Sequence, residues 1–115
     1  MKFLILVNES PWGSGLSLSA CRFITALIDS GSQVSAVFFR EDGVYNALQG
    51  KVSDAGTPEL SGIWKAFSDN NGIRLLLCSS SVQRRINETA SPPFEITGLA
   101  EMLELMASSD RVVSF

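Results

Sequence analysis

The residues best suited to chemistry lie in one short segment, which begins with a cysteine, continues with three serines and carries two arginines. They are Cys78, Ser79, Ser80, Ser81, Arg84 and Arg85. A cysteine is a nucleophile as its thiolate, but a thiol of ordinary pKa is only a few per cent ionised near neutral pH. Unpaired amides at a helix N-terminus and nearby hydroxyls or cations favour the thiolate. If a helix begins after Cys78, the segment predicts a partly exposed thiol of lowered pKa.

The positions of the two cysteines also allow a purely structural interpretation. Free cysteines are among the most buried residue types, and Cys78 closes an apolar run that begins at Ile73. Position alone therefore leaves both interpretations of Cys78 open. Cys21 lies at helical spacing from Ile24 and Ile28 with no activating group nearby, and it is predicted to be a packing residue. The two cysteines provide neither a disulfide nor a metal-binding framework.

The chain contains no histidine, which narrows the chemistry open to Cys78. A Ser-His-acid triad, a Cys-His pair and histidine metal sites are all excluded. Thiol exchange and sulfane-sulfur transfer remain, because neither requires a strong base. The loop Gly13-Ser14-Gly15 lacks the third glycine of a dinucleotide fingerprint and the Gly-Lys-Ser/Thr of a phosphate loop, so a nucleotide site is not expected.

Length and composition indicate a single domain over residues 1–115 that works away from membranes and nucleic acids. The 115 residues carry 12 acidic and 9 basic side chains, a net charge of −3, which argues against a surface for phosphate contacts. No apolar run is long enough to span a membrane. Asn8 to Pro11 interrupt the first apolar run, which is read as a strand and not as a signal peptide. Free thiols suit the reducing cytoplasm, which is the expected location.

Apolar periodicity divides the chain into alternating strands and helices. Strands are predicted at 2–8, 33–39, 73–78 and 111–113. Helices are predicted from Leu16 to a stop at Gly31 and at 58–70, 79–86 and 98–108. The remaining segments are predicted as a turn at 40–43, one helical turn at 44–48, and loops at 51–57 and 87–93. This alternation predicts an α/β domain of three layers, with a mainly parallel sheet and helices on both faces. Reactive groups in such sheets gather beyond the carboxyl ends of the strands. The loops 8–15, 40–47 and 78–82 should converge there.

Two sequence blocks and several single positions match a known family. The matching residues are Phe38-Phe39 with Gly43-Val44-Tyr45-Asn46-Ala47, Trp64, the stretch from Gly72 to Cys78 with Arg84-Arg85, and Asp110-Arg111-Val112-Val113 with Phe115. On these residues the chain resembles the DsrE/TusD sulfur-relay family over nearly its whole length, with the strongest likeness to the TusD/DsrE subunit. The resemblance implies a DsrE-like fold of flavodoxin-like topology. The segment between Arg85 and Phe94 is shorter than family members usually carry.

The resemblance implies a definite function for Cys78. In the family, the matching cysteine takes a sulfane sulfur from a TusA-type donor, becomes a persulfide, and passes the sulfur to a TusE/DsrC-type acceptor. The subunit works in a heterohexamer with TusC/DsrF-like and TusB/DsrH-like paralogous subunits. The sulfur serves 2-thiolation of the tRNA wobble uridine or dissimilatory sulfur oxidation. No metal or organic cofactor is expected.

The other candidate residues are expected to support this cysteine. The amides of Ser79, Ser80 and Ser81 would stabilise its negative charge. Tyr45 and Asn46 would line the pocket, and Arg84 and Arg85 would supply positive potential or contact a partner. Two alternatives remain open: a non-catalytic scaffold subunit of the same kind of complex, in which Cys78 only packs, and a small-ligand-binding flavodoxin-like module.

Overall fold

The computed structural model describes residues 1–12, 15–48, 60–86 and 90–115. Within these ranges the elements are β1 (Lys2–Val7), α1 (Leu16–Asp29), β2 (Gln33–Phe39), the 3₁₀-helix η1 (Glu41–Ala47), α2 (Leu60–Asn71), β3 (Arg74–Cys78), α3 (Ser79–Arg85), β4 (Phe94–Thr97), α4 (Leu99–Ser108) and β5 (Arg111–Ser114). The predicted loop 51–57, the start of the loop 87–93, and Gly13 and Ser14 of the glycine loop lie outside the described residues.

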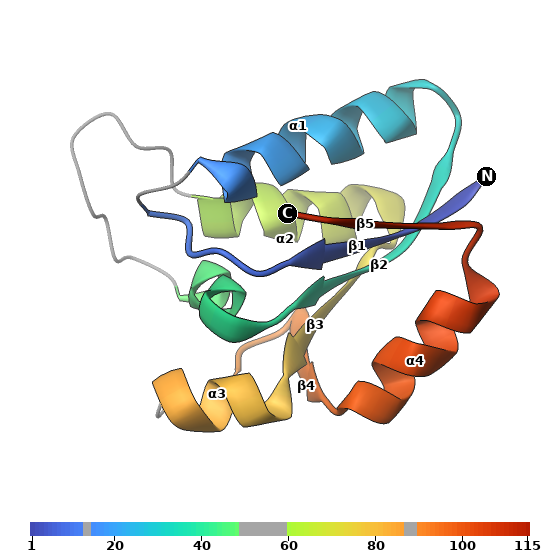
Figure 1. The fold of residues 1–115 in the computed structure, drawn as a ribbon. Helices are drawn as coiled ribbons and strands as arrows, with labels where there is room; N and C mark the ends of the chain where they lie inside the picture. The colour runs from blue at the N-terminus through green and yellow to red at the C-terminus, as the bar shows by residue number, and fades with distance from the viewer. Residues whose placement is uncertain (13–14, 49–59, 87–89) are drawn as a thin grey trace.

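The strands form one parallel sheet in the order β4-β3-β2-β1-β5. Helices α1 and α2 cover one face, and α4 lies on the opposite side (Figure 1). Helix α3 packs against η1, and its Val82 is buried in the same cluster as α1 and α2. This arrangement confirms the predicted α/β architecture of three layers with a mainly parallel sheet. All strands end at the same edge, so the segments that follow β1, β2 and β3 meet there.

Burial of the central strands on both faces explains their continuous apolar sequences. Along β1, Ile5 and Val7 face α1 and α2, whereas Leu4 and Leu6 face the opposite cluster under α4. Aromatic side chains fill the first of these layers. Trp64 of α2 is completely buried, and its ring lies 5.0 Å from that of Phe39 and 6.0 Å from that of Phe67 (centroid distances).

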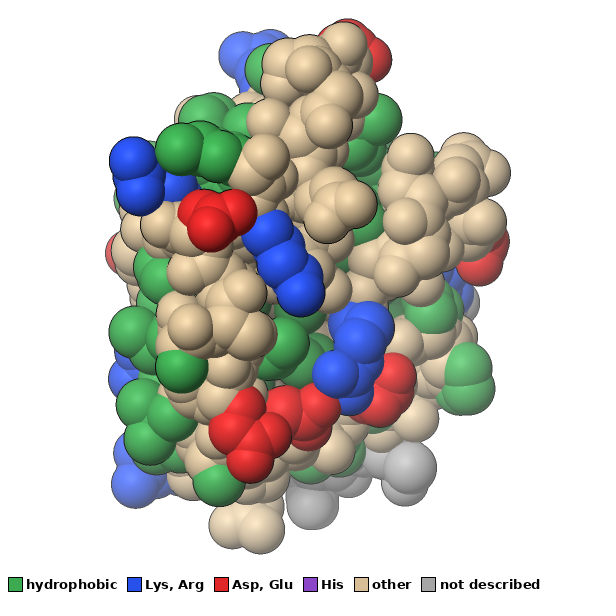
Figure 2. All heavy atoms as spheres, turned by 90° about the vertical axis from the view of Figure 1, so that its right-hand side faces the viewer, with side chains coloured by type: hydrophobic (Ala, Val, Ile, Leu, Met, Phe, Trp, Pro, Cys, Tyr) green, Lys and Arg blue, Asp and Glu red, His purple; other side chains and the backbone are tan. Residues whose placement is uncertain are grey.

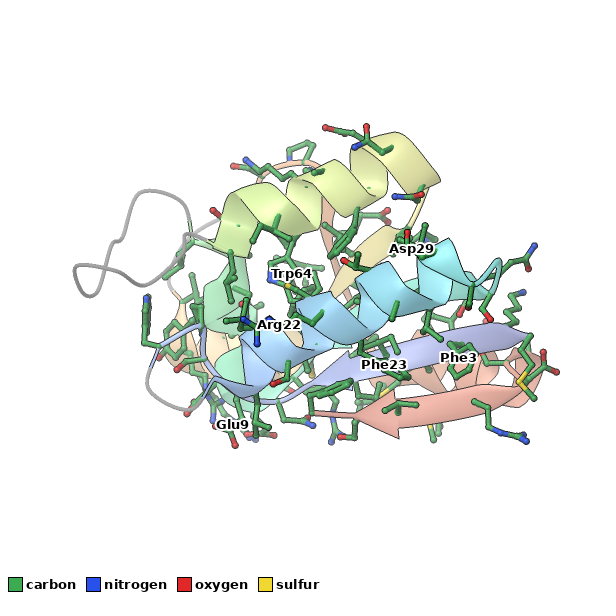
Figure 3. The ribbon with its side chains drawn as sticks, turned by 90° about the horizontal axis from the view of Figure 1, so that it is seen from above. Phe3, Glu9, Arg22, Phe23, Asp29 and Trp64 are labelled. Carbon is green, nitrogen blue, oxygen red and sulfur yellow. The ribbon has the colours of Figure 1, made fainter. Side chains whose placement is uncertain are left out.

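The sequence of helix α1 explains both its buried face and the residue at which the helix ends. Its apolar face turns Cys21 and Ile24 into the core, and Phe23 packs edge-on against Phe3 of β1 with ring centroids 6.1 Å apart (Figure 3). Gly31 follows the helix with φ 85°, a left-handed conformation that glycine adopts without a steric penalty. The predicted stop of this helix at Gly31 is confirmed.

Two details differ from the sequence prediction. The sheet has a strand that the pattern did not predict, β4, which forms an edge beside β3. Only Phe94 of its four residues is buried, so this short edge strand lacks an apolar run. The predicted turn at 40–43 and helical turn at 44–48 form instead one 3₁₀-helix from Glu41 to Ala47.

The close approach of η1 to the end of β1 requires glycine at position 43. A Cβ atom at Gly43 would overlap the carbonyl oxygen of Val7. The contact is to backbone, so a flexible side chain cannot relieve it. Gly43 therefore fixes the distance between η1 and the sheet, beside the carboxyl ends of the strands.

Gly43→Ala is expected to lower the free energy of unfolding by about 1–3 kcal/mol, because the added methyl group must displace backbone. Gly62→Ala is the matched control. Gly62 lies in α2 with open space around its Cβ position, and alanine there should raise stability by about 0.5–1 kcal/mol. Denaturant unfolding of both variants measures the two effects. Equal stability changes in the two variants would contradict this account of Gly43.

Candidate functional site

Cys78 lies at the junction of β3 and α3. It is the last residue of the strand and the N-cap of the helix, with φ −64° and ψ 121°. The prediction that a helix begins directly after Cys78 is confirmed. The Cys78 sulfur lies 3.3 Å from the Ser80 hydroxyl oxygen, and these two atoms share one hydrogen bond. The thiol is thus placed at a strand end, against the first turn of a helix.

The Cys78 side chain is more buried than the sequence suggested. Only 4% of the residue is exposed, and its side chain packs in the cluster with Phe38, Leu76 and Met102. The prediction of a partly exposed thiol is therefore wrong. The reason is the register of β3: Cys78 and Leu76 point to the same face of the sheet, which α4 covers through Met102.

Two opposing effects act on the acidity of Cys78. Burial raises the pKa of the thiol, because it disfavours the charged sulfur. Hydrogen bonds from the side chains and backbone of Ser80 and Ser81 lower it, and the net pKa lies below the ordinary value. Ser79 is not among these causes. The thiolate is therefore favoured by the first turn of α3 even though the residue is buried.

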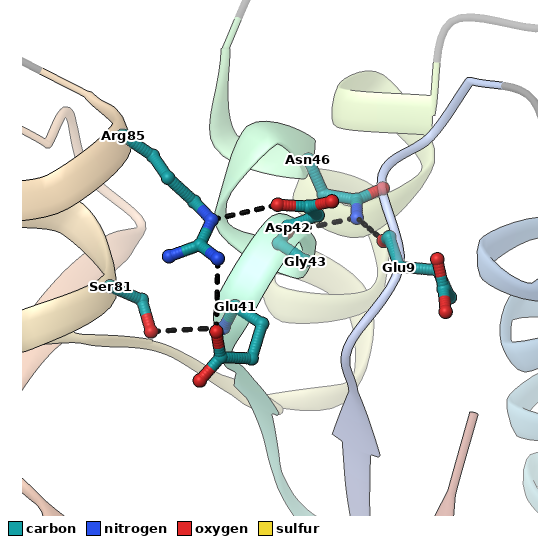
Figure 4. Close-up of polar contacts among 7 residues, drawn as sticks. All are labelled: Glu9, Glu41, Asp42, Gly43, Asn46, Ser81 and Arg85. Carbon is teal, nitrogen blue, oxygen red and sulfur yellow. Dashed lines mark hydrogen bonds and ion pairs between the residues drawn. The ribbon is translucent and has the colours of Figure 1, made fainter.

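The first turn of η1 is attached to α3 by three polar contacts (Figure 4). The Glu41 amide donates to the Ser81 hydroxyl at 2.9 Å. Arg85 reaches the Glu41 carboxylate at 2.9 Å and the Asp42 carboxylate at 2.7 Å. Glu41 itself has φ 49°, a left-handed conformation that costs a residue with a side chain about 1–2 kcal/mol. These contacts hold that conformation in place.

Asn46 and Tyr45 lie in different surroundings. Asn46 is 1% exposed; its side-chain amide donates to the carbonyl oxygens of Gly43 and Glu9 and to the Ser17 hydroxyl, and its oxygen accepts from the Trp64 indole. Its polar atoms thus join segments that follow β1 and β2 to α1 and α2. Tyr45 is half-buried, and its ring lies 5.5 Å from that of Trp12.

The two arginines of α3 also differ from each other. Arg85 is engaged by Glu41 and Asp42, whereas Arg84 is exposed and makes no ion pair among the residues that the structure describes. Neither arginine is among the causes of the lowered pKa of Cys78. The causes that lower this pKa are the hydrogen bonds of Ser80 and Ser81.

Cys21 has the properties of a packing residue, as predicted. It is 4% exposed in the core under α1, and burial raises its pKa to about 12. At pH 8 a thiol of that pKa is ionised to about one part in ten thousand. No hydrogen bond that favours its thiolate opposes this effect.

Alkylation of the native protein is therefore expected to modify Cys78 long before Cys21. At pH 8 we expect a rate difference of at least about a hundredfold, because alkylation proceeds through the thiolate. Peptide mapping after timed exposure to iodoacetamide measures the two rates. Similar rates for the two cysteines in the folded protein would contradict the assignment of Cys21 to the core.

Sequence reasoning missed the acidic partners of Arg85. Glu41 and Asp42 follow β2, and they pair with Arg85 of α3. The predicted convergence of the loops after β2 and β3 was the one feature of the sequence that could have indicated this pairing. The convergence itself is confirmed by the Glu41–Ser81 and Asn46–Glu9 contacts. The left-handed backbone of Glu41 has no sequence signature, since glycine or asparagine is usual there.

Other features of the described part of the chain lie away from Cys78. A groove of about 510 Å³ between α1 and α2 is lined by none of the predicted site residues. Among the described residues, no three metal-ligating side chains gather at one place. No helix in this part of the chain has the length and apolarity needed to cross a membrane.

Comparisons with known proteins agree with this fold over the whole chain. The crystal structure of the ychN protein from E. coli superposes with a TM-score of 0.86, covering 100% of this chain and 99% of that one, at 24% identity. Sulfurtransferase TusD of Cronobacter sakazakii is 31% identical over 128 residues, and Sulfurtransferase TusD of Salmonella typhi is 32% identical over 130. Both alignments cover all of both proteins. A model of the DsrE/DsrF-like family matches residues 1–115, so the chain belongs to the DsrE/DsrF-like family.

Proposed function

We propose that this protein is a sulfurtransferase subunit of a sulfur relay, in which Cys78 carries a sulfane sulfur as a persulfide. The observation that carries the proposal is the place of Cys78, a thiol of lowered pKa at the end of β3 and the start of α3. Relatives named Sulfurtransferase TusD, at 31% and 32% identity over full length, support the same class of activity.

The proposed reaction consists of two thiol exchanges. The Cys78 thiolate attacks the outer sulfur of a donor persulfide, the donor's S–S bond breaks, and the donor leaves as a thiolate. An acceptor thiolate then attacks the outer sulfur of the Cys78 persulfide and releases the Cys78 thiolate. Each step forms one S–S bond and breaks another, so neither an oxidant nor a base beyond the thiolate itself is needed.

Protein partners follow from this chemistry and from the family. We assign the donor to the TusA type and the acceptor to the TusE/DsrC type, with TusC/DsrF-like and TusB/DsrH-like subunits completing a heterohexamer in the cytoplasm. The sulfur would serve tRNA wobble-uridine 2-thiolation or dissimilatory sulfur oxidation. No direct contact with nucleic acid is part of this proposal.

The surface over α4 supports a role for protein partners. Leu99, Leu103 and Met106 are exposed along one side of α4 at helical spacing, with exposed fractions of 47%, 60% and 37%. Figure 2 views the molecule from the side on which α4 lies, and hydrophobic side chains are exposed there beside charged ones. Exposed apolar groups that lie together commonly mark protein contacts. The other side of α4 covers the cluster that contains Cys78.

A scaffold subunit is the second candidate, because Cys78 is only 4% exposed. Sulfur transfer from a persulfide donor to an acceptor thiol protein separates the two candidates. A sulfurtransferase takes up one sulfur atom and passes it on, whereas a scaffold subunit takes up none. The intact mass of the protein, followed before and after addition of the acceptor, measures both steps. A mass that does not change with a competent donor would contradict the proposed function.

A further inference from the structure

The hydroxyl of Ser80 is in direct contact with the sulfur of Cys78. The two atoms lie 3.3 Å apart and share one hydrogen bond, in which either group can donate while the sulfur is a thiol. A thiolate has no proton, so the Ser80 hydroxyl must then donate and the sulfur accept. The bond is therefore strongest when Cys78 carries its negative charge, because hydrogen bonds to charged acceptors are stronger than neutral ones.

The surroundings of the two residues differ, and the difference makes this bond depend on the charge of the sulfur. Cys78 packs against Phe38, Leu76 and Met102, whose apolar side chains offer no donor to a charged sulfur. Ser80 is an exposed residue, so its hydroxyl can turn to water at little cost when the sulfur carries no charge. Burial raises the pKa of Cys78, and the side-chain hydrogen bond from Ser80 is the largest of the causes that lower it.

The charge on the Cys78 sulfur changes in opposite directions in the two steps of the proposed reaction. In uptake, the Cys78 thiolate forms a new S–S bond, and the charge leaves this sulfur as the donor departs as a thiolate. In release, an acceptor attacks the outer sulfur, the same S–S bond breaks, and its electron pair returns to the Cys78 sulfur. A group that stabilises charge at this position weakens the nucleophile in uptake and improves the leaving group in release.

We propose that the Ser80 hydroxyl is a catalytic residue for sulfur release, which donates its hydrogen bond to the Cys78 sulfur as the S–S bond breaks. The hydroxyl touches the reacting atom at the position where negative charge develops in this step. The inference rests on the proposed function and adds a direction to it. The hydrogen bond favours passing the sulfur on over retaining it, so Cys78 acts as a carrier that gives up its sulfur readily.

The test follows both steps with small reagents, so that docking of a protein partner limits neither rate. Glutathione persulfide supplies the sulfur, and intact mass measures its uptake. The loaded protein is freed of the donor and treated with cyanide, which takes the outer sulfur as thiocyanate and leaves Cys78 as a thiolate. Ser80→Ala is compared with wild type at the same pH. Ser80 is exposed, so alanine there is expected to leave the fold intact.

Ser19→Ala is the matched control. Ser19 is also an exposed serine in the first turn of a helix, but this helix is α1, which packs on the other face of the sheet from the cluster that contains Cys78. The variant therefore removes an equivalent hydroxyl without touching the sulfur. It should match wild type in both steps.

We expect Ser80→Ala to release sulfur about threefold more slowly than wild type and to take it up about threefold faster per thiolate. A hydrogen bond to a charged group changes an equilibrium by a factor of about ten, and rates of thiol exchange follow roughly half of that change on a logarithmic scale. Uptake per thiolate is the measured rate divided by the thiolate fraction. Ultraviolet absorbance gives this fraction at the same pH, after subtraction of the signal of Cys78→Ser.

Opposite changes in the two steps distinguish a catalytic hydroxyl from a structural one, because a loss of structure would slow both. Rates that move in the same direction in Ser80→Ala, that do not move, or that move equally in Ser19→Ala would overturn the inference while wild type still transfers sulfur. A wild-type protein that takes up no sulfur from a donor able to load other persulfide-carrying proteins would instead overturn the proposed function, and this inference with it.

Discussion

Cys78→Ser is expected to reduce sulfur transfer to the rate of the uncatalysed reaction. A serine hydroxyl cannot form a persulfide, and no other thiol in the chain can replace the missing one. Cys21 is buried under α1, and its pKa of about 12 keeps it protonated at neutral pH. The assay follows sulfur from a persulfide donor to an acceptor thiol protein, with each variant at equal concentration.

Cys21→Ser is the matched control for this experiment, because it removes the other thiol of the chain. We expect this variant to transfer sulfur at a rate close to wild type, after correction for any loss of folded protein. The hydroxyl introduced in the core lowers stability, so the assay is run well below the melting temperature. Transfer that persists in Cys78→Ser and disappears in Cys21→Ser would reverse the assignment of the two cysteines.

Asn46→Leu is expected to lower the free energy of unfolding by about 3–4 kcal/mol. The side chain is 1% exposed, and its amide and oxygen make hydrogen bonds to four groups from four parts of the chain. Leucine has a similar size but leaves the indole N–H of Trp64 buried without a partner. A buried polar group that loses its partner costs about 1–3 kcal/mol, and the Gly43 carbonyl loses the Asn46 donor as well.

Two further variants isolate this effect in denaturant unfolding. Asn70→Leu makes the same substitution on the exposed side of α2 and is expected to change stability by less than about 0.5 kcal/mol. Trp64→Phe removes the indole N–H that donates to Asn46. The substitution should therefore lower the free energy of unfolding by less in the Asn46→Leu background, where that hydrogen bond is already absent, than in wild type. Equal costs in both backgrounds would show that the Asn46–Trp64 hydrogen bond contributes nothing to stability.

Most of the fold could be predicted because its signals are local. The apolar runs of β1, β2 and β3 and the periodic faces of α1, α2 and α4 are visible in the sequence, and their alternation implies a parallel sheet. β4 could not be predicted, because its four residues bury only Phe94 and depend on pairing with β3. The 3₁₀ form of η1 depends on the close contact of Gly43 with β1, which is a tertiary feature.

The position of Cys78 could be predicted from the sequence, but the burial of the site residues and their contact partners could not. The predicted end of the strand at residue 78 and the predicted helix directly after it placed Cys78 correctly. The burial of its side chain depends on which face of β3 it occupies and on Met102 of α4, and neither follows from the segment itself. Asn46 was expected to line a pocket, but its partners Trp64 and Ser17 come from distant parts of the sequence. The engagement of Arg85 by Glu41 likewise spans 44 positions.

Direct localisation of the transferred sulfur is the sharpest test of the claim that Cys78 is the chemical centre. The wild-type protein is exposed to a persulfide donor, freed of it, blocked with an alkylating reagent, digested and sequenced by tandem mass spectrometry. We predict one additional sulfur atom, located on Cys78, that disappears when an acceptor thiol is added before blocking. A sulfur located on Cys21, or no additional sulfur with a donor that loads other persulfide-carrying proteins, would contradict the account.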